Sequence, residues 1–322
     1  MKRTVSICLA AVLAASAFAG CSGNSSPTAR DSAKLKILTT IAPQYDWLVN
    51  ITQGAKDVEL TMLLDSGADL HSFQPSADDL YSISNADVFV YTGGESDKWV
   101  DKALKNSTDV LAVNLMELLG DKAKQEEAVE GMQTDGHEDS EEAAEYDEHI
   151  WLSLKNAEYV CEKICGKLSE KDSANKDVYE KNTKAYTQKL HKLENEYEKA
   201  VKDAKFNTLL FADRFPFRYL TDDCNLKYYA AFSGCSAETE ASFETVKFLS
   251  DKLSELKLPA VMTIDGSDKK IAETVRENSS NKDAEILTLD SMQSMKSADI
   301  KNGNDYIKVM TNNLEVLKKA LG

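Results

Sequence analysis

The sequence predicts an α/β protein of two lobes, each with a mostly parallel sheet flanked by helices. Short strand-like apolar segments alternate with helical segments in both halves of the chain, which is typical of βαβ units. Between the halves lies an amphipathic segment at 176–204 in which Tyr186, Leu190, Leu193 and Tyr197 recur at spacings of four and three. This is the period of one helix face, so one long helix is expected to join the lobes.

The first half alternates in order up to residue 115. Strands are expected at 35–40, 58–64, 88–91 and 110–115, and helices at 45–52, 76–84 and 98–105. The segment at 88–91 is apolar throughout, which indicates a strand buried on both faces.

The second half repeats the alternation after helices at 151–168 and 176–204. Strands are expected at 208–212, 226–232, 261–264 and 286–289, and helices at 243–256, 267–277 and 305–321. Ligands of open α/β sheets collect beyond the carboxyl ends of the strands. His71, Asp213 and Asp290 all lie at or shortly after such ends, so we group them as candidate ligands.

The N-terminus indicates export. Lys2 and Arg3 precede an apolar run at 5–18 and the small residues before Cys21, which predicts a lipoprotein signal at 1–20 with Cys21 lipidated. Ordinary secretion with Cys21 as a thiol is the alternative. Residues 21–33 are expected to form a flexible tether. The formal charge of −16 argues against nucleic acid as a partner and suits a cation.

An acidic stretch at 121–148 interrupts the alternation. It has almost no large apolar side chains, so we expect it to lack structure of its own. It is either a solvated spacer or a loop that collects cations through His137, Glu138 and Asp139.

The cysteines leave two possibilities open. Cys224 and Cys235 flank the strand expected at 226–232, and an extracytoplasmic compartment permits a disulfide between them. The sequence alone does not determine the pairing. Cys161 and Cys165 share one helix face and are expected to be small buried apolar side chains.

Two of the four histidines, His71 and His149, stand in apolar, turn-bounded settings. Imidazole is the commonest side-chain ligand of transition metals. Two imidazoles and two carboxylates would form a four-coordinate site that suits Zn²⁺, whereas Mn²⁺ favours oxygen more strongly. The chain has no His-Glu-x-x-His motif, nucleophile elbow or phosphate-binding Gly-rich loop, so we expect a binding protein and not an enzyme.

Several blocks in order resemble the zinc/manganese-binding lipoproteins that act as receptors of bacterial ABC metal importers. The blocks are APQYDWL at 42–48, GADLHSFQPS at 67–76, NADVFVY at 85–91, GGE at 93–95 with Trp99, HIWL at 149–152, AETEAS at 237–242 and LDSM at 289–292. The resemblance implies lobes at 34–174, containing the acidic loop 121–148, and at 205–322. It also implies a rigid linking helix at 175–204 and a metal held in the cleft between the lobes.

The resemblance carries three ligands over directly: His71, His149 and Asp290. The third family ligand, in the first strand–helix loop of the second lobe, has no direct match. Alignment with the family pattern without a gap places Arg214 at this position, and a shift of one residue places Asp213 there. Glu240 is a further candidate. We favour Asp213, with Arg214 hydrogen-bonding a ligand carboxylate, because a guanidinium cannot bind a cation.

These features predict a monomeric receptor, anchored outside the cell membrane by its N-terminal lipid, that captures Zn²⁺ and delivers it to an ABC permease. A Mn²⁺ receptor of the same importer class and a surface adhesion lipoprotein are the alternatives. Zinc is favoured by the acidic, histidine-containing loop.

Overall fold

The computed structural model describes residues 34–322 except 106, 108, 134–145 and 237–239. The expected signal at 1–20, the tether at 21–33 and Cys21 lie outside the described residues. So do His137, Glu138 and Asp139 of the acidic loop.

The first lobe is built on a four-stranded parallel sheet in the order β2-β1-β3-β4. Its strands are β1 (Leu35–Thr39), β2 (Val58–Met62), β3 (Val88–Tyr91) and β4 (Leu111–Asn114). All four residues of the central strand β3 are buried, as its apolar run predicts. The helices of this lobe are α1 (Ala42–Ile51), α2 (Ala77–Ser84), α3 (Trp99–Leu104) and α4 (Leu115–Leu119).

The second lobe repeats this topology, with a parallel sheet in the order β6-β5-β7-β8. Its strands are β5 (Thr208–Phe215), β6 (Lys227–Ser233), β7 (Ala260–Ile264) and β8 (Glu285–Leu289). Its helices are α7 (Arg218–Asp223), α8 (Phe243–Leu256), α9 (Lys270–Asn278), α10 (Ser297–Lys301) and α11 (Tyr306–Leu321). The predicted fold class of two parallel α/β lobes is confirmed.

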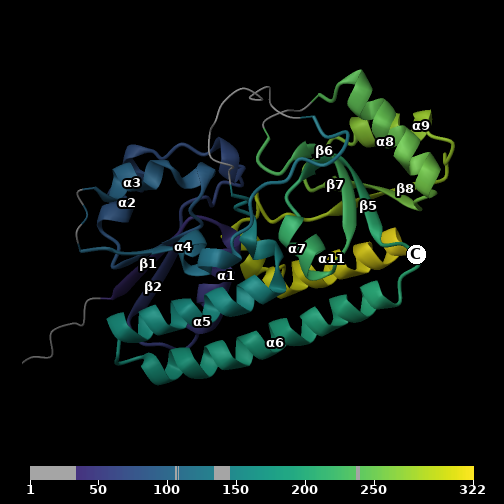
Figure 1. The fold of residues 1–322 in the computed structure, drawn as a ribbon. Coiled ribbons are helices and arrows are strands. Elements are labelled where there is room, and N and C mark those ends of the chain that lie inside the picture. The colour runs from purple at the N-terminus through teal and green to yellow at the C-terminus, as the bar shows by residue number, and fades with distance from the viewer. Residues whose placement is uncertain (1–33, 106, 108, 134–145, 237–239) are drawn as a thin grey trace, which may run out of the picture. The chain divides into compact units, whose positions relative to one another are not determined.

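Helices α5 (Leu154–Lys171) and α6 (Lys176–Lys202) pack side by side, and α6 runs along both lobes (Figure 1). At a rise of 1.5 Å per residue, α6 is about 40 Å long. The Tyr186 hydroxyl donates to Asp46 Oδ2 on α1 at 2.9 Å, and the Tyr197 hydroxyl donates to the carbonyl of Met310 on α11 at 2.6 Å. The predicted long helix is therefore present and is bonded to both lobes.

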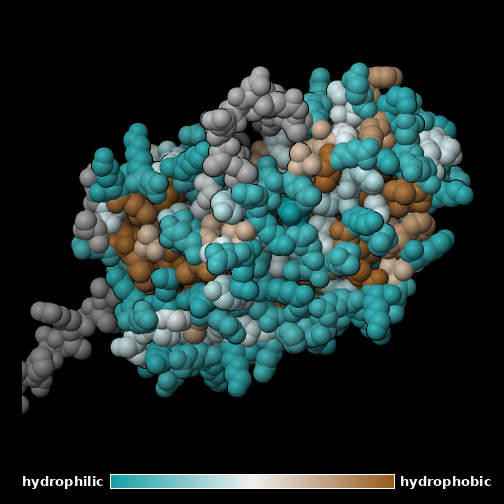
Figure 2. Space-filling view, viewed as in Figure 1, coloured by the Kyte–Doolittle hydropathy of each residue, from teal (hydrophilic) through white to brown (hydrophobic). Residues whose placement is uncertain are grey.

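The core continues from one lobe to the other beneath the two sheets. Trp151 belongs to it, and its indole N–H donates to the Ser291 carbonyl while its own carbonyl accepts from the Tyr306 hydroxyl. Trp47 and Trp151 are buried, whereas Trp99 is only partly buried. Hydrophilic residues cover the face along α5 and α6 (Figure 2). None of the described helices is long and apolar enough to cross a membrane.

The possible disulfide between Cys224 and Cys235 is not present, because both are free thiols. Strand β6 lies between them, and seven residues at about 3.3 Å each separate its ends by roughly 20 Å. A disulfide requires Cα atoms no more than about 7 Å apart. Cys161 and Cys165 are buried in the core, as predicted.

The ends of the acidic stretch 121–148 are more ordered than predicted. Gln125 forms an antiparallel bridge with Tyr146, and Gln133 forms a parallel bridge with Phe232 of β6. Asp147 and Glu148 are buried. The expectation of a structureless loop is therefore wrong for these parts of the stretch.

Candidate metal centre

His71 is placed by the loop that follows β2. Asp69 caps the short 3-10 turn Leu70–Ser72, since its Oδ1 accepts the backbone N–H of His71 at 3.0 Å. The buried Leu70 anchors the turn in the core. The second oxygen of Asp69 accepts from the Arg214 guanidinium at 2.9 Å, so this loop is also held by the second lobe.

His149 is placed by the end of the acidic stretch. Asp147 Oδ1 accepts both the backbone N–H of His149 at 2.8 Å and its ring Nδ1 at 2.9 Å. The Tyr219 hydroxyl of α7 donates to the Asp147 carbonyl at 2.8 Å. The His149 side chain has no exposed surface.

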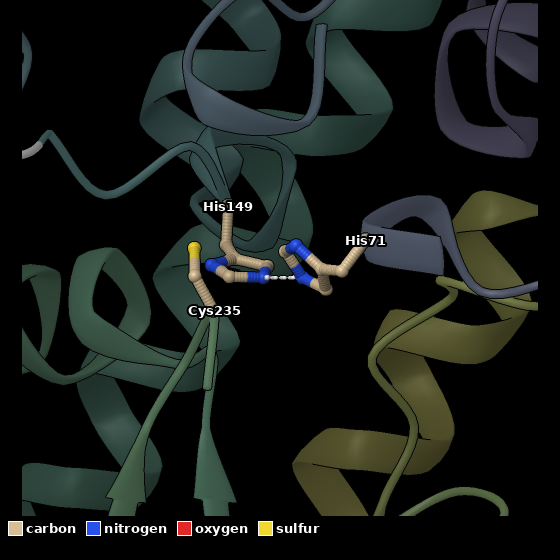
Figure 3. Close-up of side chains that lie close together, drawn as sticks. All are labelled: His71, His149 and Cys235. Carbon is tan, nitrogen blue, oxygen red and sulfur yellow. Dashed lines mark hydrogen bonds between the residues drawn. The ribbon is translucent and has the colours of Figure 1, made fainter. Parts of the chain in front are cut away.

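The two imidazoles meet with their Nε2 atoms 3.1 Å apart (Figure 3). In a tetrahedral Zn²⁺ site with Zn–N distances near 2.05 Å, two ligand nitrogens lie about 3.3 Å apart. The side chains therefore already have nearly the separation that a shared metal requires.

A carboxylate orients each imidazole from its other nitrogen. Asp147 does so for His149, and Glu148 Oε1 lies 3.1 Å from Nδ1 of His71. Ser96 supports the second pair, because its hydroxyl donates to Glu148 Oε1 and lies 2.8 Å from His71 Nδ1. An ionised carboxylate only accepts hydrogen bonds, so each Nδ1 carries a proton. With both Nδ1 atoms protonated, a hydrogen bond between the two Nε2 atoms requires a further proton on one of them, and a bound cation would take the place of that proton.

The pKa shifts agree with this assignment. Burial raises the pKa of Glu148, but the hydrogen bond with His71, the charges of both histidines and the Ser96 hydroxyl lower it more, so the net shift is downward. Burial lowers the pKa of His149, but the charge and hydrogen bond of Asp147 outweigh this and the net shift is upward. The surroundings of His149 therefore favour a positive charge at this point.

Cys235 and Gln293 complete the immediate surroundings. Sγ of Cys235 and one nitrogen of each imidazole lie within 4.8 Å of one another. Cys235 lies just beyond the carboxyl end of β6 (Figure 3). The Gln293 amide nitrogen lies 3.2 Å from His71 Nε2. Burial, together with the carboxylates of Glu148, Glu126 and Asp147, raises the pKa of the Cys235 thiol well above its ordinary value.

The predicted carboxylate ligands are not part of this group. Asp213 lies on β5, where its oxygens accept the backbone N–H groups of Arg214 and Ile264. Asp290 accepts the Met292 N–H at 2.8 Å, and burial followed by the charges of Asp265 and Asp299 raises its pKa to about 6. Glu240 is exposed.

A cleft of about 710 Å³ gives solvent access to His71. Both lobes line it, with Asp69 and His71 on one side and Asp213, Arg214 and Asp265 on the other. His71 retains 13% of its side-chain surface, whereas His149 has none. An ion from solvent therefore reaches His71 first.

Sequence reasoning missed the residues that orient the imidazoles. Asp147 and Glu148 stand directly before His149, but the prediction that this stretch lacks structure hid their role. Gly93-Gly94 was a usable signal, because both residues have positive φ and a Cβ on Gly94 would lie 2.7 Å from Glu148 Oε2. Ser96 and Gln293 gave no signal of their own.

A second group of possible ligands lies on the surface of α5 and α6. Nδ1 of His191 lies 3.2 Å from Glu194 and 3.5 Å from Glu158. His191 is largely exposed, and Lys155 competes for Glu194 at 3.4 Å. These ion pairs account for the group without a metal.

Known proteins share this fold and sequence pattern. The family model described as zinc-uptake complex component A, periplasmic (ZnuA) matches residues 37–320. The chain is 30% identical to the zinc-binding lipoprotein AdcA of Streptococcus pneumoniae over 89% of its length, and spans 56% of that protein. It is 29% identical to the manganese ABC transporter substrate-binding lipoprotein PsaA of the same species, over 100% of this chain and 99% of PsaA.

A solved structure shows the same architecture. The Zn(II)-bound ZnuA-like domain of Streptococcus pneumoniae AdcA superposes with a TM-score of 0.70 at 26% identity, covering 90% of this chain and 99% of that one. With the family model matching nearly all the described residues, the chain belongs to the family of zinc-uptake complex component A, periplasmic.

Proposed function

We propose that this protein is the extracytoplasmic substrate-binding receptor of an ABC metal importer, that it captures Zn²⁺ between His71 and His149, and that it is not an enzyme. The observation that carries the proposal is the 3.1 Å approach of the two Nε2 atoms, each in a ring whose Nδ1 is held by a carboxylate. Because the two rings already have this orientation without a metal, metal binding requires less reorganisation of their side chains.

The route of the ion follows from the exposure of the two rings. His71 meets the ion at the wall of the cleft, and His149 then binds it from the buried side. Asp147 and Glu148 stay hydrogen-bonded to the Nδ1–H groups, which strengthens both imidazoles as ligands. Delivery to a permease partner would reverse these steps.

Manganese is the second candidate substrate. PsaA and AdcA are equally similar to this chain, so the relatives do not separate the two metals. Zn²⁺ is favoured because the facing ligands are nitrogens, whereas Mn²⁺ suits carboxylate, carbonyl and water oxygens better. We further propose anchoring through a lipid on Cys21 and a monomeric state.

The test is metal analysis of the purified full-length chain with competitive Zn²⁺ and Mn²⁺ titrations. His71→Ala and His149→Ala are the test variants, and His191→Ala is the matched surface control. The proposal expects one tightly bound zinc, lost in both test variants and kept in the control. Tight manganese binding with weak zinc binding would make manganese, and not zinc, the proposed substrate. Absence of any bound metal would reject the receptor function in favour of the adhesion alternative.

A further inference from the structure

Cys235 lies near the two histidines, and neither the fold nor the proposed function accounts for its presence there. Its thiol forms no disulfide, and its side-chain contacts are the Glu126 carboxylate and Glu148 Oε1, the latter at 4.0 Å, a long contact for a weak donor. The backbone of this loop packs directly on His149, since a Cβ on Gly234 would lie 2.9 Å from Cε1 of that ring. The chain therefore brings a sulfur to the same place as the imidazoles.

We infer that the Cys235 thiolate is the third protein ligand of the captured metal. The inference rests on the proposed function and specifies the ligand set at the same site. Sγ and a nitrogen of each histidine are within 4.8 Å of one another without a metal. In a tetrahedral Zn²⁺ site with Zn–S near 2.3 Å, sulfur and nitrogen ligands lie about 3.6 Å apart. A sulfur–nitrogen pair at the 4.8 Å limit would need to approach by roughly 1 Å.

Competing ligands are already engaged in other bonds. Asp213 accepts the backbone N–H groups of Arg214 on β5 and Ile264 on β7, and Asp290 accepts the Met292 N–H. Glu148 and Asp147 each hold an imidazole Nδ1. Among the residues that the structure describes, Cys235 is the one that joins both histidines in a group of close ligand atoms.

The binding step is balanced by the release of one proton. As the metal–Sγ bond forms, the thiol proton leaves to solvent and the sulfur becomes a thiolate. Two neutral imidazoles and one thiolate leave a single positive charge on a Zn²⁺ site, next to the carboxylates of Asp147 and Glu148. The fourth position remains for water or for the Gln293 amide beside His71.

A thiolate ligand also determines which metals bind. Soft thiolates favour zinc and other thiophilic ions, whereas manganese prefers oxygen ligands. Cys235 would therefore strengthen the preference for zinc over manganese that the two imidazole nitrogens already give.

Cobalt substitution tests the inference, because a Co²⁺–thiolate bond gives a near-ultraviolet charge-transfer band and nitrogen or oxygen ligands do not. We use the full-length chain with Co²⁺, comparing Cys235→Ser with Cys224→Ser, the other partly exposed cysteine. The wild-type protein and Cys224→Ser should show the band, and Cys235→Ser should bind Co²⁺ without it. Its zinc affinity should fall by at least roughly 100-fold, because loss of a ligand should cost no less than the upper range for loss of a residue that supports one, with manganese affinity unchanged.

The outcomes separate the two proposals. Bound Co²⁺ without the band in the wild-type protein overturns the role of Cys235 and leaves the receptor function intact. No bound metal in the wild-type protein overturns the receptor function. If Cys235→Ser does not fold, alkylation of the wild-type protein, followed by mass spectrometry, decides instead. Zinc should slow the alkylation of Cys235 and leave that of Cys224 unchanged. Equal alkylation rates of Cys235 with and without zinc overturn the inference.

Discussion

Glu148 Oε1 lies 3.1 Å from Nδ1 of His71, so the residue that precedes one histidine in the chain orients the other. Asp147, one position earlier, orients His149. Two adjacent carboxylates thus align two imidazoles that are 78 positions apart in the sequence.

Replacing Glu148 by Gln should weaken zinc binding by about 10–100-fold. The amide lacks the negative charge that strengthens His71, and its NH₂ group cannot accept the Nδ1–H proton. Competitive titration against a chromogenic chelator measures the change. Glu117→Gln, an exposed carboxylate on α4, is the control and should bind zinc like the wild type. Unchanged affinity in Glu148→Gln would show that this carboxylate does not support the site.

Gly234→Ala should weaken metal binding by a steric effect. The added Cβ would lie 2.9 Å from Cε1 of His149 and 3.0 Å from the Phe215 carbonyl, so the ring or the end of β6 has to move. Gly166→Ala, in the middle of α5 with open space around its Cα, should instead raise the unfolding free energy by about 1 kcal/mol. Titration and urea unfolding distinguish the two, and wild-type zinc affinity in Gly234→Ala would show that the contact with His149 is not tight.

The unfolding free energy should decrease as the pH rises from about 4 to about 7, because of buried carboxyl groups. Burial, with the charge of Asp305, raises the pKa of Asp46 to about 7 although the Tyr186 hydrogen bond opposes this. In this window the folded protein keeps a proton that the unfolded chain has released. The unfolding free energy therefore decreases as the pH rises, by at most about 1.4 kcal/mol per pH unit for one such group.

Asp46→Asn should make this decrease shallower, because the amide does not titrate. Urea unfolding of the metal-free protein at several pH values measures the slope, with the exposed Asp203→Asn as control. Equal slopes in the wild type and Asp46→Asn would mean that Asp46 is already ionised in the folded protein.

Tyr197→Phe should reduce the unfolding free energy by about 1 kcal/mol. The variant removes the 2.6 Å hydrogen bond from α6 to the Met310 carbonyl while keeping the buried ring. Chemical denaturation compares it with Tyr81→Phe, which alters a largely exposed side chain. A loss no greater than that of the control would show that packing alone joins α6 to the second lobe.

The fold could be predicted because its signals are local. The apolar run of β3 and the spacing of Tyr186, Leu190 and Tyr197 on α6 each determine an element from neighbouring residues. The two facing histidines could be predicted from strand ends and from the resemblance of whole motifs, but their 3.1 Å approach could not.

The surroundings of the histidines depend on contacts between distant segments. Glu148 is acidic and lies in an acidic stretch, so composition predicts that it is exposed. It is buried instead, and its contacts with Ser96 and His71 stabilise the buried carboxylate. The sequence already predicts the strand between Cys224 and Cys235, but it does not show that the Cys235 thiol lies beside the two histidines. These surroundings of the histidines could not be predicted without the tertiary structure.

The most direct test of the central claim is a crystal structure of the zinc-loaded full-length protein with anomalous diffraction at the zinc edge. The account predicts one strong peak about 2.0–2.1 Å from Nε2 of both His71 and His149. A strong peak only at the surface group of Glu158, His191 and Glu194, or no peak beside the two facing imidazoles, would contradict it.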